Sequence, residues 1–245
     1  MPMRATTVRF SEDLWRLLER EAAREGVSAA QFIRDATVMR AAYAMGRRGD
    51  GAYEAGAEEG STPDAADAAG AERRRALLAA AAAVRDPDRL EALRATGLLD
   101  SAPDPGFDRH VRLAAEVLNA PVALVSLVDE KRQFFKSCLG VAEPWASDRE
   151  APLSHSFCQH AVAQREPLVV DDAREHPVLR DNPAIVDMGA VAYAGVPLVD
   201  AGGHALGTLC VIDSRPRQWS SHQVALLADL AASVVSEIAL ARVAT

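Results

Sequence analysis

The stretch YAGVPLVDAGGHALGTLCVID, residues 193–213, decides the fold of the larger part of this 245-residue chain. Two runs of apolar and β-branched residues flank a pair of glycines, Gly202 and Gly203. Such runs on either side of a glycine turn predict a β-hairpin. The hairpin indicates a sheet to which other apolar runs of the chain contribute strands.

The segments around this hairpin predict a compact α+β domain. Apolar runs at 121–129, 132–137 and 167–172 predict strands, the first two close enough to form a second hairpin. Helical spacing predicts helices at 107–118, 156–164 and 221–242, with a long loop at 173–189. The fold class that we predict is α+β, with a central antiparallel sheet flanked by helices.

Composition restricts the class of protein. Hydrophobic residues make up 49% of the chain and charged residues 25%, which is typical of a soluble globular protein that buries a core. We find neither an unbroken apolar run of membrane-spanning length nor a secretory signal. The three cysteines are Cys138, Cys158 and Cys210, an odd number that favours reduced thiols. We therefore expect a cytoplasmic protein.

The N-terminal residues 1–46 form a separate pattern. Thr6, Val8 and Phe10 alternate as in a strand, Ser11 can cap a following helix, and Gly26 can end it. Ser28 then opens a second helix. The net charge of the chain is −8, but residues 1–48 hold nine arginines against six acids. This segment has the sign that a polyanion prefers.

The stretch TTVRFSEDLWRLLEREAAREGVSAAQFIRDA, residues 6–36, resembles the ribbon-helix-helix family of DNA-binding proteins. The resemblance implies an obligate dimer in which two strands pair and enter the major groove of operator DNA. Strand alternation would turn one set of side chains toward the bases, and the second helix would hold a phosphate at its N-terminus. The residues expected to contact DNA are Arg4, Ala5, Thr7, Arg9 and Ser28. A ribbon that only dimerises is the alternative.

Two connecting segments follow. Residues 47–70 are rich in Gly, Ala and acids and contain few residues that can form a core, so we predict a flexible linker. Residues 71–99 predict two connecting helices with a break at Pro87. Residues 100–245 form the large domain.

From about residue 88 the chain resembles the GAF domains of bacterial sensors. The resemblance is carried, in order, by residues 89–140, SHSFCQHAV at 154–162, PLVVDDAREHPVLRDNP at 167–183 and the hairpin at 193–213. It implies a central antiparallel sheet with a small-molecule pocket on one face. It does not identify the ligand or a cofactor.

Residues 156–162, SFCQHAV, are the best candidate for chemistry. A capping box of Ser156 and Gln159 would place Cys158 in the first turn of a helix, where a thiolate is stabilised. Structural burial, contact with a ligand and a reactive thiol are three alternatives for Cys158. His160 lies too far around the helix to act with Cys158 on one atom, and we expect no metal site. The expected ligand-binding residues are Phe157, Cys158, His160, Asp172, Tyr193, Thr208 and Cys210.

Taken together, these patterns predict a one-component transcriptional regulator that binds operator DNA and senses a small molecule or a redox state. A heptad-like seam in the last helix, Leu227, Ala231, Val234, Ile238 and Ala241, favours a homodimer. We expect no catalysis, since hydrolase and nucleotide-binding motifs are missing. One alternative is an interaction adaptor dimerised by both modules. The other is a GAF-type thiol reductase that works through Cys158 together with Cys210 or Cys138.

Overall fold

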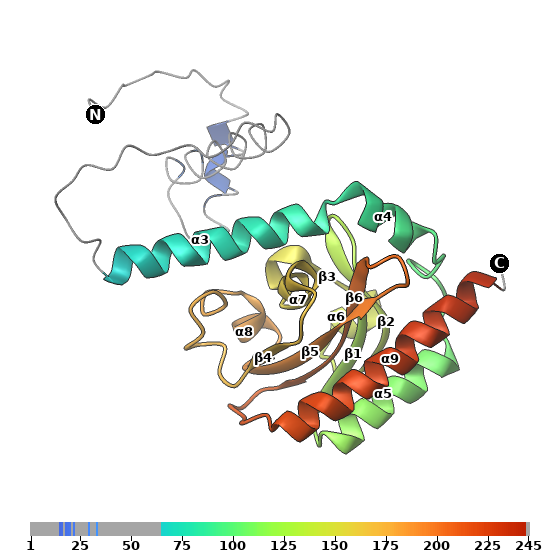
Figure 1. Ribbon diagram of the computed structural model, residues 1–245. Helices are drawn as coiled ribbons and strands as arrows, with labels where there is room; N and C mark the ends of the chain where they lie inside the picture. The colour runs from blue at the N-terminus through green and yellow to red at the C-terminus, as the bar shows by residue number, and fades with distance from the viewer. Residues whose placement is uncertain are drawn as a thin grey trace, which may run out of the picture. The chain divides into compact units, whose positions relative to one another are not determined.

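The computed structural model in Figure 1 describes residues 65–243 without a break. It also describes eight residues nearer the N-terminus, all helical: Trp15, Arg16, Leu18, Glu19, Arg20, Ala22, Ala29 and Ile33. The chain divides into two compact units, Met1–Thr62 and Pro63–Thr245. The residues expected to contact DNA, namely Arg4, Ala5, Thr7, Arg9 and Ser28, lie outside the described residues.

The second unit is built on a six-stranded antiparallel sheet, as the sequence predicts. Its strands are ordered β3-β2-β1-β6-β5-β4, so the predicted hairpin β5–β6 lies beside β1. Asp200 closes the turn of that hairpin, because its Oδ1 accepts hydrogen bonds from the amides of Gly202 and His204, both at 2.9 Å. The strands are β1 (Val122–Val128), β2 (Arg132–Leu139), β3 (Glu150–Pro152), β4 (Leu168–Val170), β5 (Ala192–Val199) and β6 (Ala205–Asp213).

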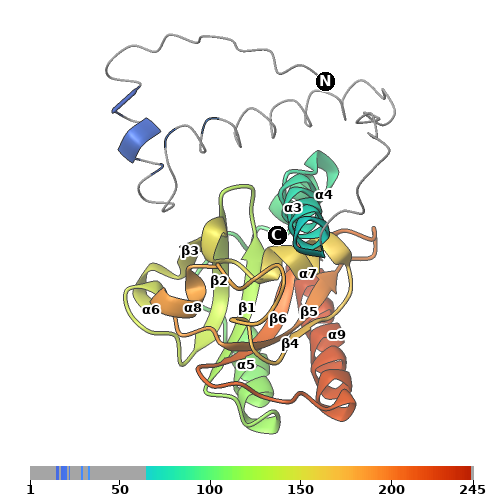
Figure 2. The same ribbon diagram turned by 90° about the vertical axis from the view of Figure 1, so that its left-hand side faces the viewer.

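Helices cover both faces of the sheet (Figures 1 and 2). One face carries α5 and α9, and the other carries α7 with α3 packed against it. The helices are α3 (Ala65–Val84), α4 (Pro87–Arg94), α5 (Pro105–Val117), α6 (Trp145–Asp148), α7 (Cys158–Gln164), α8 (Ala184–Asp187) and α9 (Ser221–Val243), with a 3-10 turn η1 (Leu153–His155).

Helix α5 shows why the first face forms a core. Asp104 caps it by accepting a hydrogen bond from the Gly106 amide at 2.8 Å, and Pro105 occupies the first turn. Its buried residues recur at helical spacing and contact the sheet. They are Phe107, His110, Val111, Ala114 and Ala115.

Helix α9 differs from its prediction in what its apolar seam contacts. Four of the five seam residues, Leu227, Ala231, Val234 and Ile238, are buried in the core between α9, α5 and the sheet. The seam therefore stabilises the domain itself and gives no support to a dimer, which stays a prediction. Residues 221–241 also have the length and composition of a membrane span, contrary to our expectation from unbroken apolar runs.

Three local features differ from the prediction. Residues 65–70, expected to belong to the linker, are the first turns of α3. The loop predicted at 173–189 contains the short helix α8. The segment between β2 and α7 adds α6, β3 and η1, each only three or four residues long. Elements this short carry too few residues for a periodic pattern to develop.

Candidate functional site

The three central strands place a group of polar side chains on the face that α7 covers. Ser126 on β1 lies opposite Thr208 on β6, and Cys210 follows two residues later on the same face. Tyr193 on β5 belongs to the same layer, as does Cys158 at the start of α7. We call these five residues the thiol–hydroxyl cluster. All five side chains are buried.

The cluster is held together by contacts between sulfur and hydroxyl groups. The Sγ atoms of Cys158 and Cys210 lie 3.9 Å apart, and the Tyr193 hydroxyl donates to Cys158 Sγ at 3.5 Å. The Phe157 ring meets the Tyr193 ring edge-on, with centroids 5.6 Å apart. The hydroxyl oxygens of Ser126 and Thr208 are buried without a hydrogen-bond partner among the described residues.

A glycine makes room for the tyrosine. Gly195 lies two residues after Tyr193 on the same face of β5 and pairs with Cys210 across the hairpin. A Cβ atom at position 195 would overlap the Tyr193 hydroxyl and ring. The ring therefore lies over Gly195, in the space that a side chain would otherwise fill, and its hydroxyl reaches toward Cys158.

The side chains around the two thiols lower the pKa of Cys158 and raise the pKa of Cys210. The hydrogen bond with the Cys210 thiol is the main reason that the pKa of Cys158 is lowered to about 6, against the opposing effect of burial. The Thr208, Tyr193 and Ser126 hydroxyls lower the pKa of Cys158 further, and of these three only the Tyr193 hydroxyl makes a hydrogen bond of full geometry to its sulfur. Interaction with Cys158 and burial raise the pKa of Cys210. Cys158 is thus the first thiol of the pair to ionise.

The predicted capping box is half correct. Ser156 Oγ accepts from the Gln159 amide at 3.1 Å, but the Gln159 side chain donates to the carbonyls of Ser156 and Leu153 instead of returning to the Ser156 amide. Ser156 Oγ itself donates to Gln133 Oε1 at 2.9 Å. Cys158 lies in the first turn of α7, as predicted, and hydrogen bonds with neighbouring side chains lower the pKa of its thiol.

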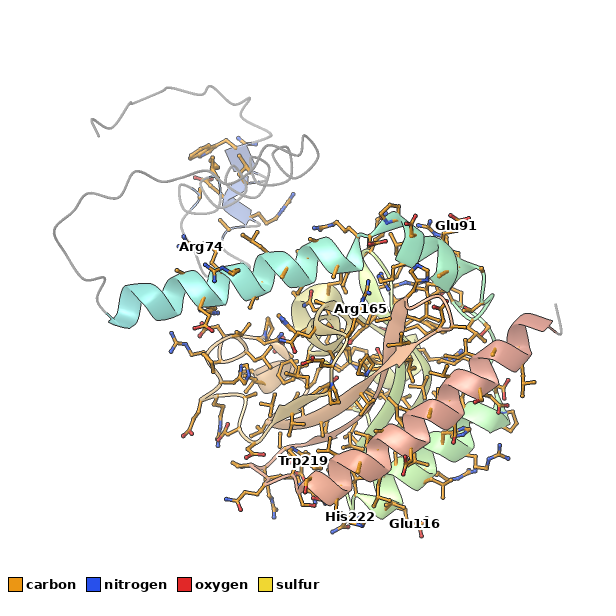
Figure 3. The ribbon with its side chains drawn as sticks, viewed as in Figure 1. Arg74, Glu91, Glu116, Arg165, Trp219 and His222 are labelled. Atoms are coloured by element: carbon orange, nitrogen blue, oxygen red, sulfur yellow. The ribbon has the colours of Figure 1, made fainter. Side chains whose placement is uncertain are left out.

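Five of the seven predicted ligand-binding residues lie together and two do not. Phe157, Cys158, Tyr193, Thr208 and Cys210 meet around the cluster. Asp172 is bound to Arg174 at 2.6–2.8 Å and lines a separate open hollow of about 340 Å³ together with Trp219. Trp219 lies near the beginning of α9 (Figure 3). The sequence analysis missed Ser126, although strand alternation puts it on the same face as Leu124 and Val128.

His160 lies on α7 but is associated with His176 rather than with the cluster. Burial, with a smaller contribution from the nearby His176, lowers the pKa of His160 to about 4. The neutral imidazole therefore suits this position, and a protonated one does not.

This burial predicts a loss of stability in mild acid. An unfolded histidine binds its proton near pH 6.5, whereas His160 in the folded chain binds it only near pH 4. Between these values the unfolded state holds more protons, so stability falls as pH falls. Urea unfolding should show a loss of about 1 kcal/mol from pH 7 to 5.5 that is absent in His160→Gln. An equal loss in the variant would assign the effect to other groups.

A second hydrogen-bonded chain lies at the surface. Ser154 Oγ contacts His155 Nδ1 at 3.0 Å, and His155 Nε2 contacts Asp187 Oδ2 at 2.9 Å. The residue types are those of a hydrolase triad, but Ser154 and Asp187 are exposed, and the hollow beside Trp219 is lined by other residues. We interpret the chain as a link between η1 and α8.

Among the described residues, no group of three or more His, Cys, Asp or Glu side chains is arranged to hold a metal ion. The two thiols of the cluster are accompanied by neutral hydroxyls rather than by further metal-binding side chains.

Comparison with known proteins gives the family. The GAF domain model matches residues 103–238. A cyclic di-GMP phosphodiesterase of Pseudomonas aeruginosa is 35% identical over 144 residues, which are 58% of this chain and 24% of that protein. The chain thus spans about a quarter of this curated relative.

The solved structures to which the chain is similar are more distant in sequence. The GAF domain of a phosphoenolpyruvate-protein phosphotransferase from Coxiella burnetii is 21% identical, with a TM-score of 0.49, covering 63% of this chain and 95% of that one. A free methionine-R-sulfoxide reductase from Neisseria meningitidis is 18% identical, with a TM-score of 0.46, covering 77% and 99%.

These findings correct the predicted function. The curated relative is a cyclic di-GMP phosphodiesterase, and this finding contradicts the prediction of a one-component transcriptional regulator. The prediction for the large domain is confirmed, because the family model covers more than half of the chain. The chain belongs to the GAF domain family.

Proposed function

We propose that the chain is a signal-sensing protein in which the thiol–hydroxyl cluster receives the signal, without catalytic turnover. Membership of the GAF family supports a sensing role, and the curated relative has a similar segment in a protein of cyclic di-GMP turnover. All three cysteines are free, which supports our expectation of a reducing, cytoplasmic location. The ribbon-helix-helix resemblance of residues 1–46 stays a prediction.

The observation that carries the proposal is the pair of unpartnered hydroxyls on Ser126 and Thr208. Burying such a group without a partner costs about 1–3 kcal/mol, so most buried polar atoms are hydrogen-bonded. Here two of them lie side by side, fully buried, in the centre of the sheet. They would be satisfied by an effector that donates or accepts hydrogen bonds.

The surroundings indicate the chemical class of this effector. The five side chains of the cluster are uncharged hydroxyls and thiols apart from the ionisable Cys158, and an apolar layer surrounds them. An anionic effector would lose its hydration without gaining a counter-charge. A small uncharged molecule fits better, and it would occupy the space over Gly195 after the Tyr193 ring rotates away.

The packing of α7 suggests how the signal leaves the site. α7 carries Cys158 on the side of the sheet and packs against α3 on its other side. An ion pair between Arg73 and Asp181, at 2.6 Å, further ties α3 to the loop before α8. Displacement of Tyr193 would move α7 and change the packing of α3.

Replacing Thr208 with valine tests whether the Thr208 hydroxyl stabilises the fold or serves to bind an effector. Valine has nearly the same shape, so losing an unpartnered hydroxyl should leave the free energy of unfolding unchanged or raise it by about 1 kcal/mol. Thr96 is a matched control, because its buried hydroxyl donates to Leu93 O at 2.6 Å. Thr96→Val should therefore lose about 1 kcal/mol in urea unfolding. Destabilisation of Thr208→Val as large as that of Thr96→Val would show that the Thr208 hydroxyl has a structural partner.

Hydrogen exchange tests the sensing role directly. The purified chain is incubated with the low-molecular-weight fraction of a bacterial extract under reducing conditions, and amide exchange in α7 and β6 is measured. Protection in the wild type that is lost in Thr208→Val supports the proposal. No protection, or equal protection in both proteins, contradicts it.

A further inference from the structure

The two buried cysteines of the cluster form a pair that ligand contact alone does not explain. Their sulfur atoms touch at 3.9 Å across the interface between α7 and β6, although 52 residues separate them in the chain. The only hydrogen-bond donor in contact with Cys158 besides the second thiol is the hydroxyl of Tyr193, among the described residues. A thiol surrounded by a second thiol and a donor is arranged for reaction rather than for packing alone.

We propose that Cys158 and Cys210 are an oxidation site at which a small hydroperoxide forms an intramolecular disulfide. This inference rests on the proposed function in that it uses the same cluster. It adds a covalent signal to the site and names hydroperoxides as the class of oxidant.

The chemistry balances in two steps. The Cys158 thiolate attacks one oxygen of the hydroperoxide, the O–O bond breaks, and the leaving oxygen takes up a proton to become water or an alcohol. Cys158 is now a sulfenic acid. Cys210 sulfur then attacks Cys158 sulfur, its proton leaves with the hydroxyl as water, and the S–S bond forms. Two thiols lose two electrons, which reduce the peroxide.

The order of the two cysteines follows from their environments. Tyr193 donates to Cys158, and the pKa of Cys158 is lowered while that of Cys210 is raised. The thiolate is the nucleophile, so Cys158 reacts with the peroxide and Cys210 resolves the product. The sulfur atoms must approach by about 2 Å to reach bonding distance. The short helix α7 can supply this movement by shifting toward β6.

Cys138 cannot replace either member of the pair. Leu124 on β1 pairs with Cys138 on one side and with Cys210 on the other, so two strand spacings separate these cysteines. That is roughly 10 Å between Cα atoms, beyond the range that a disulfide spans. Burial raises the pKa of Cys138, which makes it the less reactive thiol.

Burial determines which oxidants can react. Cys158 and Cys210 are 3% and 0% exposed, so only small molecules can reach them, through fluctuations of the fold. Hydrogen peroxide and small alkyl hydroperoxides meet this condition. Bulky disulfides such as glutathione disulfide do not. We therefore expect the pair to react with small hydroperoxides and not with bulky disulfides.

The formation of the disulfide would change the packing of α7 on the sheet. The bond draws α7 toward β6 and converts the acceptor of the Tyr193 hydroxyl from a thiolate to a weakly accepting disulfide sulfur. α3 packs on α7, so the same movement reaches the helix through which we propose that the signal leaves.

The experiment uses the full chain carrying Cys138→Ala, so that the pair is the only thiol chemistry. The protein is treated with hydrogen peroxide in a reducing-agent-free buffer, unfolded in an alkylating reagent, digested and analysed by mass spectrometry. We expect both thiols to be lost together and the peptides of Cys158 and Cys210 to be linked, with full reversal by a reductant. Glutathione disulfide should give no such product.

Three variants sharpen the test. In Cys210→Ala we expect a sulfenic acid on Cys158 that dimedone captures, whereas Cys158→Ala should leave Cys210 unmodified at the same dose. Tyr193→Phe keeps the ring and removes the donor, and should slow oxidation about threefold to tenfold. If Cys158→Ala fails to fold, two measurements still test the disulfide. They are the linked peptide in the Cys138→Ala protein and the rate of oxidation in Tyr193→Phe.

The inference is overturned if peroxide leaves both thiols free, if it links two chains, or if it gives only singly oxidised Cys158 in the intact pair. Pure protein and peroxide are the only reactants, so these outcomes do not depend on any effector from the extract. Protection by the extract together with unreactive thiols would retain the proposed function and reject the disulfide. A disulfide without protection by the extract would support oxidation and reject an uncharged effector.

Discussion

Replacing Arg89 with methionine is expected to lower the free energy of unfolding by about 3 kcal/mol. The Arg89 guanidinium is buried and donates to four backbone carbonyls from three parts of the fold. Its Nε and Nη2 reach Ala83 O and Val84 O at the end of α3, at 3.1 and 2.6 Å. Its Nη1 reaches Val128 O and Ala205 O, at 2.8 and 3.3 Å.

The size of the effect follows from what methionine leaves behind. Methionine fills a similar volume but donates nothing, so the carbonyls lose their partner while staying buried. Burial lowers the pKa of Arg89, although Asp129 and Asp86 counteract it, so the charge itself is held by its surroundings. The variant should unfold at lower urea, and amide exchange in α3 should rise because its last turn is no longer tied to the ends of β1 and β6.

Arg85→Met is the matched control. Arg85 lies four residues earlier, is exposed, and follows directly after α3. Its replacement should change the free energy of unfolding by no more than about 0.5 kcal/mol. Equal effects of the two variants would show that the four carbonyls are satisfied in some other way and that Arg89 does not anchor α3.

Arg89 also illustrates a limit of the sequence analysis. In the run DRLEALRATGLL, the charged residues belong by pattern to the solvent face of an amphipathic helix. The pattern correctly predicts α4, with Leu90 and Leu93 buried. It does not show that Arg89 points inward, because its acceptors come from 83–84, 128 and 205. Such contacts between distant segments depend on the tertiary fold.

The strands and their faces were more accessible to prediction. The β5–β6 hairpin, β1 and its pairing with β2 follow from apolar runs and turns, and all are confirmed. With the strands in place, alternation puts Tyr193, Thr208 and Cys210 on one face. These residues were predicted to line a pocket, and either Cys210 or Cys138 was expected to act with Cys158 in the reductase alternative. The sequence does not choose between these two partners, because α7 has to be docked on the sheet before the distance between the sulfur atoms exists.

Local sequence patterns are ambiguous where two different structures produce the same pattern. The seam of α9 has coiled-coil spacing, but a helix that packs on its own sheet shows the same stripe. Asp172 follows a strand and was expected near Phe157 and Cys158, whereas it binds Arg174 and lines the separate hollow beside Trp219. Ser126 drew no attention, since a single serine within an apolar strand has no distinct spacing or charge.

Replacing Gly207 with alanine is expected to have the second large effect, a loss of about 3 kcal/mol or more in the free energy of unfolding. Gly207 pairs with Leu127 across β1 and β6, and a Cβ atom there would overlap the carbonyl oxygen of Ser126. The obstacle is backbone in the centre of the sheet, which cannot rotate away as a flexible side chain does. The two strands must separate locally.

Gly70→Ala is the control, because Gly70 lies in α3 and a Cβ atom there meets nothing within 4 Å. Alanine is the better helix former, so this variant should be as stable as the wild type or more stable by about 0.5 kcal/mol. Urea unfolding of the two variants compares the same added methyl group at a position with free space and at one where it meets the backbone. A Gly207→Ala protein as stable as Gly70→Ala would mean that β1 and β6 are less closely paired than described.

The same substitution also tests whether the sheet positions the thiol–hydroxyl cluster. Ser126 and Thr208 pair next to Gly207, so separating the strands there moves both hydroxyls and shifts Cys210 relative to α7. Under conditions in which Gly207→Ala stays folded, peroxide should link Cys158 and Cys210 more slowly than in the wild type. An unchanged rate in a destabilised variant would show that α7 follows β6 as one body, so that the distance between the sulfur atoms is set by their direct contact and not by the pairing of the strands.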